Sequence, residues 1–329
     1  MRDLAVIIPT YNSAPYVIEC LESVKRINPG EVIVVDDGSS DDTELIVHKW
    51  CETFEGNVRF TKTNHLGVSA ARNKGMELVS KQFLMFVDAD DLLNEEVVDK
   101  FCALHLRQDI DLISISANGR TGIAEVDNRN KLDFQRSLTG LVEYQGLITA
   151  VFSKIYTVQY LRRHNIRFNE NIEKAEDALF NMQVIQCNPK ISFEKMPLYL
   201  YRKNQQSITR SYSYHIARNY ELTHNEILEF FLHKGSSVEV KTILANWLIR
   251  DFKNLKSSDQ NYSTSILNML QVYRKTVKNP LTIKWKSFRP RQRGVYLLLC
   301  LGFIELAYIF DNIQIKPAQK SVSVEFYKL

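Results

Sequence analysis

The sequence is poor in cysteine, glycine and proline, and each shortage excludes a class of protein. Its five cysteines are scattered and contain no Cys-x-x-Cys pair, which argues against a disulfide framework and a zinc finger and fits a reducing compartment. Twelve glycines and eight prolines among 329 residues are too few for a collagen-like or low-complexity chain. Hydrophobic residues make up 45% and charged residues 24%, a composition typical of a globular protein with one large or two ordinary domains.

The start of the chain has little space for a targeting segment. A strand-like run begins at Leu4, and this leaves no room for a signal peptide. We therefore expect a cytoplasmic protein.

Charge is unevenly distributed along the chain. Residues 1–150 carry 15 Lys and Arg against 24 Asp and Glu, a balance of −9, whereas residues 151–329 carry 27 against 14, a balance of +13. A basic half attracts the phosphate groups of a ligand, a nucleic acid or an anionic membrane. The alternative is an ordinary solvated helical face.

Apolar residues in the first ninety positions alternate between strand and helix patterns. Strands are predicted over 4–8, 32–35, 58–61 and 83–87, and helices over 14–25, 42–50 and 67–79. This alternation predicts an α/β fold with a mostly parallel sheet covered by helices on both faces. Ligands of such sheets bind beyond the carboxyl ends of the strands.

The rest of the chain changes character twice. The polar segment 118–138 is interpreted as a loop, and regular structure returns with 146–155, helices over 157–163 and 175–187, and strands over 191–193 and 198–201. Beyond residue 212 the pattern is helical, over 213–233, 237–256, 262–277 and 292–310. We therefore expect a first domain over 1–210 and a helical domain over 211–329.

Each predicted strand of the first half ends in a polar cluster. The clusters are residues 9–12, 36–41, 64–69 and 88–91. A single such cluster is typical of a turn. Four of them at the same edge of a sheet indicate a binding site, because the loops at that edge face a common crevice.

The acidic cluster after the fourth strand points to a divalent metal ion. Asp88 and Asp90, with the small Ala89 between them, lie on the same side of an extended chain. Two carboxylates with open positions suit Mg²⁺ or Mn²⁺, which keep water ligands and accept phosphate oxygens. The alternative is an acidic helix start, a role that we assign to Asp91.

The order of these motifs resembles the family 2 glycosyltransferases, which have the GT-A fold. The motifs are Val-Ile-Ile-Pro-Thr-Tyr-Asn (6–12), Val-Val-Asp-Asp-Gly-Ser-Ser-Asp (34–41), Asn-x-x-Gly-Val-Ser-x-Ala-Arg-Asn-x-Gly (64–75) and Phe-Val-Asp-Ala-Asp-Asp (86–91). The resemblance is specific over residues 4–105 and weaker as far as residue 210. It implies an inverting enzyme that uses a nucleotide diphosphate sugar and a divalent metal, with a nucleotide part over 1–105 and an acceptor part over 106–210.

The resemblance also implies roles for individual residues of the nucleotide part. Pro9 and Tyr11 would line the nucleobase pocket, and Asp37 would bond the edge of the base. Asn64, Gly67 and Arg72 would lie near the nucleotide. Asp88 would contact the ribose or a metal-bound water, Ala89 would lie beside the nucleotide, and Asp90 would ligate the metal between the phosphates.

On the acceptor side the resemblance implies a catalytic base at a helix start. Glu176-Asp177 matches the family's acidic pair, and we assign the base to Asp177, where a helix N-terminus should favour the ionised form. An acidic first turn without catalytic function is the alternative. Lys154, in Ser-Lys-Ile-Tyr (153–156), is predicted to orient the acceptor or bind phosphate.

One departure concerns the loop after the last strand of the first domain. Many relatives carry a histidine in a His-x-x-Ser-x-Thr-like loop, whereas residues 201–209 keep Ser207 and Thr209 without that histidine. We expect Arg202 or Lys203 to take over the contact with phosphate. Isolated histidines such as His65 are interpreted as surface or structural residues.

The C-terminal part combines basic residues with an apolar run. The run Val295–Phe310 has sixteen residues, fewer than the roughly twenty that span a bilayer. The basic residues that precede the run are Lys284, Lys286, Arg289, Arg291 and Arg293. Segment 284–310 could bind an anionic membrane peripherally, and a buried core helix is an equal alternative.

Together these features predict a metal-dependent inverting glycosyltransferase. The expected donor is a UDP-sugar, and the expected acceptor is a lipid-linked or growing surface saccharide of a bacterium. A protein or teichoic-acid-type acceptor is an alternative, and so is a scaffold that binds a nucleotide sugar without turnover. A nucleic-acid binder is disfavoured, because the basic residues adjoin an apolar run rather than interleaved aromatic residues.

Overall fold

The computed structural model describes two compact units of the chain. One unit comprises residues 1–203 together with 324–329, and the other comprises residues 204–323. The described residues are 1–117, 121–127, 129–131, 134, 150–172, 175–202, 281–283, 285–302, 307 and 326–328, with single positions between 241 and 274.

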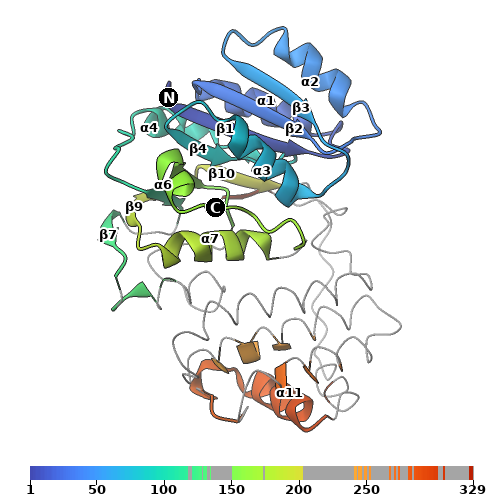
Figure 1. Ribbon diagram of the computed structural model, residues 1–329, viewed down its shortest axis with the longest axis vertical. Helices are drawn as coiled ribbons and strands as arrows, with labels where there is room; N and C mark the ends of the chain where they lie inside the picture. The colour runs from blue at the N-terminus through green and yellow to red at the C-terminus, as the bar shows by residue number, and fades with distance from the viewer. Residues whose placement is uncertain are drawn as a thin grey trace. The chain divides into compact units, whose positions relative to one another are not determined.

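The first half of unit 1 alternates strands and helices, as predicted (Figure 1). Its elements are β1 (Leu4–Thr10), α1 (Val17–Arg26), β2 (Glu31–Asp36), α2 (Thr43–Cys51), β3 (Val58–Lys62), α3 (Val68–Leu78) and β4 (Phe83–Phe86). Strands β3, β2, β1 and β4 lie side by side in that order and are parallel.

The second half of unit 1 extends this sheet. Its elements are β5 (Leu92–Leu93), a 3₁₀ turn η1 (Glu95–Val97), α4 (Val98–Cys102), β6 (Leu112–Ser116), β7 (Gly122–Glu125), β8 (Lys154–Thr157), α6 (Val158–Arg163), α7 (Glu176–Gln186), β9 (Lys190–Lys195) and β10 (Tyr199–Arg202). The described strands of the main sheet follow the order β3-β2-β1-β4-β8-β6-β9-β7. Strand β8 is antiparallel to both of its neighbours. The sheet is nevertheless mostly parallel, as predicted.

Alternate residues of β1 face opposite layers of helices. Val6 and Ile8 belong to the core that also contains Val17 and Leu21 of α1. Ile7 points to the other face, where Gly75 of α3 lies so close that a Cβ atom there would be 2.4 Å from the Ile7 Cγ2 atom. The period of two along the strand therefore produces the two helical layers.

Two segments differ from the sequence-based expectation. The polar segment 118–138, expected as a loop, contains β7, which pairs with β9 and forms the edge of the sheet. A short edge strand that is mostly exposed carries no apolar alternation, so its sequence looks like a loop. In addition, β11 (Phe326–Lys328) from the expected helical part pairs with β10, and together with β5 they form a second sheet.

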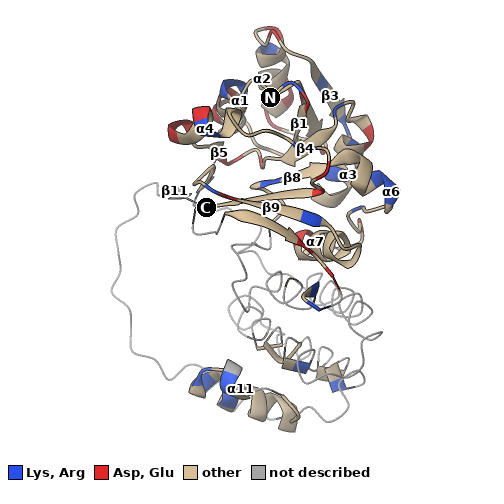
Figure 2. Ribbon diagram, turned by 90° about the vertical axis from the view of Figure 1, so that its left-hand side faces the viewer, with Lys and Arg blue, Asp and Glu red and all other residues tan. Residues whose placement is uncertain are grey.

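The described part of unit 2 centres on α11 (Pro290–Leu301), which follows the 3₁₀ turn η3 (Trp285–Ser287). The helix predicted over 292–310 does not run through: α11 ends at Leu301, and Gly302 adopts a left-handed conformation with φ of 86°. Such a glycine is the common end of a helix, because it has no Cβ to clash. Figure 2 shows the Lys and Arg positions on α11. The helix predicted over 213–233 lies outside the described residues.

No described helix is both long enough and apolar enough to cross a bilayer.

Candidate active site at the carboxyl ends of the strands

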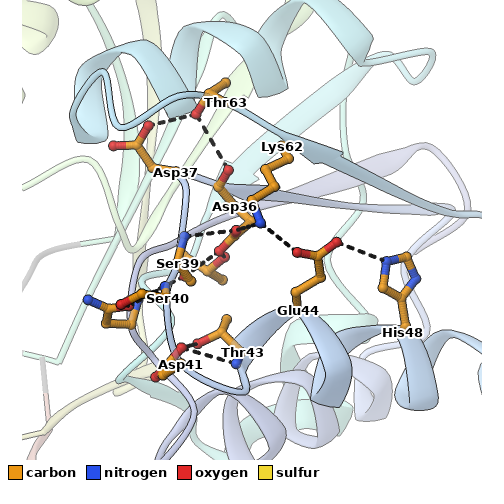
Figure 3. A network of polar contacts seen from close by, with 12 residues as sticks. Asp36, Asp37, Ser39, Ser40, Asp41, Thr43, Glu44, His48, Lys62 and Thr63 are labelled. Atoms are coloured by element: carbon orange, nitrogen blue, oxygen red, sulfur yellow. Dashed lines mark hydrogen bonds and ion pairs between the residues drawn. The ribbon is translucent and has the colours of Figure 1, made fainter.

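The loop after β2 is held together by its own carboxylates (Figure 3). Asp36 is buried and accepts hydrogen bonds from the Thr10 hydroxyl (3.1 Å) and the Ser39 N–H (3.1 Å). Asp41 accepts from the Thr43 N–H (3.1 Å). These bonds join the ends of β1 and β2 to the start of α2.

Asp37 fastens this loop to the next one. Its Oδ1 accepts from the Thr63 hydroxyl (2.6 Å) and the Leu66 N–H (2.8 Å), and its Oδ2 accepts from the Gly67 N–H (2.7 Å). Gly67 has a φ of 93°, a conformation that L side chains rarely adopt. Asp37 and Gly67, each predicted to lie near the nucleotide, therefore lie together, and both Asn64 and Gly67 are exposed.

An aromatic pair joins the loop after β1 to the loop after β3. The rings of Tyr11 and His65 stack with centroids 4.3 Å apart, and Tyr11 is 42% exposed. Pro9, the other residue assigned to the nucleobase, is buried within β1 and pairs with Val35. His65 was expected to be an ordinary surface residue, and only its place in the Asn-x-x-Gly turn could have indicated the stacking.

Arg72 is the centre of the site. Its side chain is 4% exposed and contacts three carboxylates: Asp88 (3.0 Å), Glu176 (3.2 Å) and Asp177 (2.8 Å). Its guanidinium also lies over the ring of Phe168, 5.4 Å from the centroid. These carboxylates raise the pKa of Arg72 despite the opposing effect of burial. One buried cation therefore links the strand end at Asp88 to the predicted acceptor pair.

Two further residues of α3 hold the segment before α7. The Asn73 side chain donates to the Phe168 carbonyl (2.9 Å) and accepts from the Phe168 N–H (2.9 Å), and the Ser69 hydroxyl donates to the Ile172 carbonyl (3.3 Å). Ser69 and Asn73 lie in the motif 64–75, and neither was assigned a role from the sequence. Their spacing of four, with Arg72 between them, places all three on one face of a helix and could have indicated a shared partner.

The residues of the acidic cluster after β4 differ in their exposure to solvent. The Asp88 side chain is 28% exposed and Asp90 is partly exposed, whereas Ala89 and Asp91 are buried. Asp91 accepts from the Tyr199 hydroxyl (2.7 Å) and the Arg202 N–H (2.7 Å). Burial, reinforced by the neighbouring carboxylates, raises the pKa of Asp91 to about 8.

The prediction that Asp91 caps the following helix was wrong. Asn94 is the capping residue, since its Oδ1 accepts from the Glu96 N–H at 3.1 Å. Asp91 instead secures β10, through Tyr199 and Arg202, to the loop that follows β4.

A divalent metal fits this cluster as a partly protein-bound ion. Among the described residues, no group of three or more acidic, histidine or cysteine side chains forms a complete metal cage. Asp88 and Asp90 nevertheless leave carboxylate oxygens near the surface, and Mg²⁺ and Mn²⁺ are commonly held by one or two carboxylates plus water and substrate phosphates. The donor set therefore suits an ion that arrives with a diphosphate.

The predicted catalytic pair begins α7. Glu176 and Asp177 are 16% and 17% exposed, and Asp177 also accepts from the Val151 N–H at 3.0 Å. Burial raises the pKa of both carboxyls; a second carboxylate adds to the effect, and Arg72 opposes it. Burial of the pair thus opposes the ionised form, which the helix terminus was expected to favour.

The backbone just before this helix is unusual. Ala175 adopts a left-handed conformation with φ of 63° and ψ of 17°. A non-glycine residue in that region is strained by roughly 1–3 kcal/mol and persists only where its surroundings enforce it.

Lys154 and Arg202 do not lie open to solvent. Lys154 is fully buried, its ammonium donates to the Ala150 carbonyl, and burial lowers its pKa to about 7. The Arg202 side chain is 11% exposed, and it donates to the Asp90 carbonyl (2.8 Å) and pairs with Glu19 (2.5 Å). Residues 203–209, in the loop that lacks the histidine of many relatives, lie outside the described residues.

Comparison with known proteins finds similarity to glycosyltransferases and to proteins of teichoic acid biosynthesis. The family model "Glycosyl transferase family 2" matches residues 5–164. The minor teichoic acid biosynthesis protein GgaB of Bacillus subtilis (strain 168) is 30% identical over 99% of this chain and 34% of its own length. The poly(ribitol-phosphate) beta-N-acetylglucosaminyltransferase TarS of Staphylococcus aureus (strain Mu50 / ATCC 700699) is 29% identical over 77% of this chain and 44% of its own length. The chain thus spans between a third and a half of these relatives.

A solved structure confirms the GT-A architecture. The S. aureus TarS fragment 1–349 in complex with UDP-GlcNAc matches with a TM-score of 0.64 and 23% identity, and the match covers 94% of this chain and 90% of that chain. At this level of identity the likeness shows the fold.

Proposed function

Since the chain belongs to glycosyl transferase family 2, we propose that it transfers a sugar from a nucleotide diphosphate sugar to an acceptor of a bacterial surface polymer. The observation that carries the proposal is Arg72, because one guanidinium contacts both Asp88 of the predicted donor side and Asp177 of the predicted acceptor side. The relatives GgaB and TarS support a teichoic-acid-type or other surface polysaccharide as the acceptor class.

The proposed donor is a UDP-sugar. The exposed Tyr11–His65 stack offers a flat surface for the base, and Asp37 offers an acceptor for the edge of the base. Three hydrogen bonds reach Asp37, a carboxylate accepts about four, and the His65 Nδ1 atom lies 3.7 Å from Oδ2, so the base edge would take the one remaining position. The complex of TarS with UDP-GlcNAc supports this donor class.

Asp88 and Asp90 are proposed to hold the Mg²⁺ or Mn²⁺ ion. When bound, such an ion supplies positive charge to the leaving diphosphate. Arg72 contacts the Asp88 carboxylate, and Arg202 donates to the Asp90 carbonyl. These two contacts hold the acidic cluster in place. We propose that Arg202 acts mainly by holding the Asp90 backbone and that the phosphates themselves are contacted at the Asp88–Asp90 edge.

The proposed mechanism is a single displacement with inversion. The acceptor hydroxyl oxygen attacks the anomeric carbon, its proton passes to the Asp177 carboxylate, and the bond from carbon to the diphosphate oxygen breaks. Asp177 is held by Arg72 and by the Val151 N–H, which orient the carboxylate before reaction. Glu176, on the same guanidinium, is proposed to orient the acceptor.

The remaining alternatives differ in the acceptor that receives the sugar. We propose a saccharide or polyol-phosphate polymer, carried on a lipid while it grows, over a protein acceptor. Segment 284–310 is proposed to bring the enzyme to an anionic membrane, because exposed Leu297 and Leu301 lie on the same helix as the basic residues of α11.

The test is a transfer assay with a panel of donors. The chain is incubated with UDP-, GDP- and dTDP-sugars and a ribitol-phosphate or glycerol-phosphate polymer, with Mn²⁺ or with a chelator. Ligand-observed NMR follows binding, and labelled sugar in the polymer follows transfer. We expect UDP-sugar binding, metal-dependent transfer and no transfer with chelator. Binding without transfer to any polymer, saccharide or protein would support the scaffold alternative instead.

A further inference from the structure

The buried Lys154 belongs to a chain of polar contacts that ends at Asp177. Lys154 opens β8, next to β4 and β6 in the main sheet, and its ammonium donates to the carbonyl of Ala150. That carbonyl belongs to the same peptide group as the Val151 N–H. The N–H in turn donates to Oδ2 of Asp177 at 3.0 Å.

A second side chain braces the same peptide group. The Asn181 amide approaches the Ala150 carbonyl at 3.4 Å and donates to the Asp177 carbonyl at 3.0 Å. The Tyr156 hydroxyl donates to the Asn181 side-chain oxygen at 2.8 Å and fixes its orientation. Side chains of β8 and α7 thus converge on the Ala150–Val151 peptide group, which precedes β8.

A buried lysine is costly, and its position requires a reason. Burial disfavours the charged ammonium, and a leucine or methionine would fill the same space without that cost. Lys154 cannot serve the contact with acceptor or phosphate that we predicted from the sequence, because its side chain is fully buried. Its contact with the Ala150 carbonyl is directed at the one peptide group that also serves Asp177.

We propose that Lys154 is a positioning residue for the base: it holds the Ala150–Val151 peptide group so that the Val151 N–H points at the Asp177 carboxylate. A cation at the carbonyl oxygen polarises the peptide group, and this strengthens the hydrogen bond donated by its N–H. The stronger bond favours the ionised carboxylate, which is the form that accepts a proton. The inference rests on the proposed function, in which Asp177 is the base.

Other charged and titratable groups also face Asp177 and set the background against which Lys154 acts. They are Arg72 from α3, Asp88 after β4, Tyr156 from β8 and the adjacent Glu176. None of these four contacts the Ala150–Val151 peptide group through a described hydrogen bond. The Lys154 ammonium also attracts the Asp177 carboxylate directly by charge, so the Val151 signal reports on the peptide group and the titration of Asp177 reports on both effects.

The test combines NMR with kinetics on the full chain. Protein labelled with ¹⁵N-valine is prepared as wild type, Lys154→Met and Lys131→Met, and the Val151 signal is assigned by its loss in Val151→Ile. Lys131 is the matched control, because it is also a buried lysine whose ammonium donates to a backbone carbonyl, that of Gln186 (2.9 Å) at the other end of α7.

Lys154→Met should move the Val151 amide proton resonance upfield. The pH at the midpoint of the titration of this resonance should also rise. Lys131→Met should change neither property. In the transfer assay, the acid limb of the kcat profile of Lys154→Met should shift to higher pH while KM for the donor stays the same. A shift of one pH unit would lower the rate on that limb about tenfold.

An unchanged Val151 signal and an unchanged acid limb in folded Lys154→Met would overturn the proposal. If Lys154→Met does not fold, Lys154→Gln removes the charge but keeps a polar side chain and should move the Val151 signal in the same direction; no movement there contradicts the proposal. If the wild-type chain transfers no sugar, the proposed function fails, whereas the NMR comparison still decides the role of Lys154.

Discussion

At the scale of single residues, the two carboxyls of the α7 pair should have separable effects. Asp177→Asn keeps the shape of the side chain and removes the proton acceptor, so we expect transfer to fall by about 10²–10⁴-fold. Donor affinity should change little, because the proposed nucleotide contacts lie at the strand ends around Asp37. Transfer rate and UDP-sugar affinity are measured together for Asp177→Asn and Glu176→Gln.

The comparison between these variants tests the assignment of the base. If Glu176→Gln loses transfer and Asp177→Asn keeps it, Glu176 is the base. If neither substitution matters, the base lies outside this pair.

Arg72 should resist even a conservative replacement. Arg72→Lys keeps one positive charge but lacks the forked guanidinium that reaches Asp88 and Asp177 at the same time. We expect both a lower melting temperature and a loss of transfer of on the order of 10²-fold, since misplaced catalytic groups have effects of that size. Arg59→Lys is the control, because Arg59 also pairs with a carboxylate, that of Glu31 at 3.0 Å, but is 42% exposed. Equal losses in the two variants would contradict a special role for Arg72.

At the scale of elements, α3 must lie close to β1 for its polar face to reach the acceptor segment. Gly75→Ala would place a Cβ atom 2.4 Å from Ile7 Cγ2, so the helix must move outward. We expect a destabilisation of about 1–3 kcal/mol, as for other overpacked cores. Chemical unfolding measures it, with Lys74→Ala on the exposed side of α3 as a control that should stay within about 0.5 kcal/mol.

The same variant also reports on function. A shift of α3 moves Arg72 and Asn73 together, so transfer should fall by more than the loss of folded protein explains. Full activity per folded molecule would show that the site tolerates movement of this helix.

The second element with a testable surface is α11. Leu297 and Leu301 are 38% and 66% exposed, and basic residues precede them on the same helix. Replacement of both by Ser should weaken sedimentation with anionic vesicles, because apolar contact and charge act together at a membrane surface. Leu281→Ser, at a leucine that is 51% exposed but lies outside α11, should have little effect. Wild-type protein that does not bind anionic vesicles, or binds neutral ones equally, would contradict the membrane proposal.

At the scale of the whole molecule, the charge asymmetry should govern encounter with the acceptor. Residues 151–329 have a balance of +13 and residues 1–150 a balance of −9, so a polyanionic polymer should be attracted by the second half of the chain. Retention on an immobilised ribitol-phosphate polymer should therefore weaken steadily as salt is raised, because salt screens charges over about 8 Å at physiological strength. An uncharged polysaccharide serves as the control matrix. Retention that does not respond to salt would show that the basic excess is not used for the acceptor.

Local pattern was sufficient for much of the fold and the donor side of the site. Strands β1, β2 and β4 are largely apolar, and β3 is shorter and more polar. A polar cluster follows each of the four strands, so their type, order and shared edge could be predicted from local sequence patterns. Asp37 and Gly67 meet because consecutive parallel strands bring their carboxyl ends together. Strand β7 was missed because an exposed edge strand has no apolar alternation to reveal it.

Contacts between distant parts of the chain were decided only by the tertiary structure. Arg72 and Asp177 are 105 positions apart, and nothing in either motif specifies that one guanidinium joins them. The raised pKa of the α7 pair follows mainly from burial by surrounding elements, which the sequence around residues 176–177 does not reveal. Lys154 has the residue type of a surface phosphate ligand, yet the packing of β8 between β4 and β6 buries it and turns its ammonium toward the Ala150 carbonyl. The sequence by itself determined the fold class and the chemistry available at the strand ends, because these depend on short-range period and residue type. Which charges share a buried pocket depends on long-range packing, and that is why only the tertiary structure could decide it.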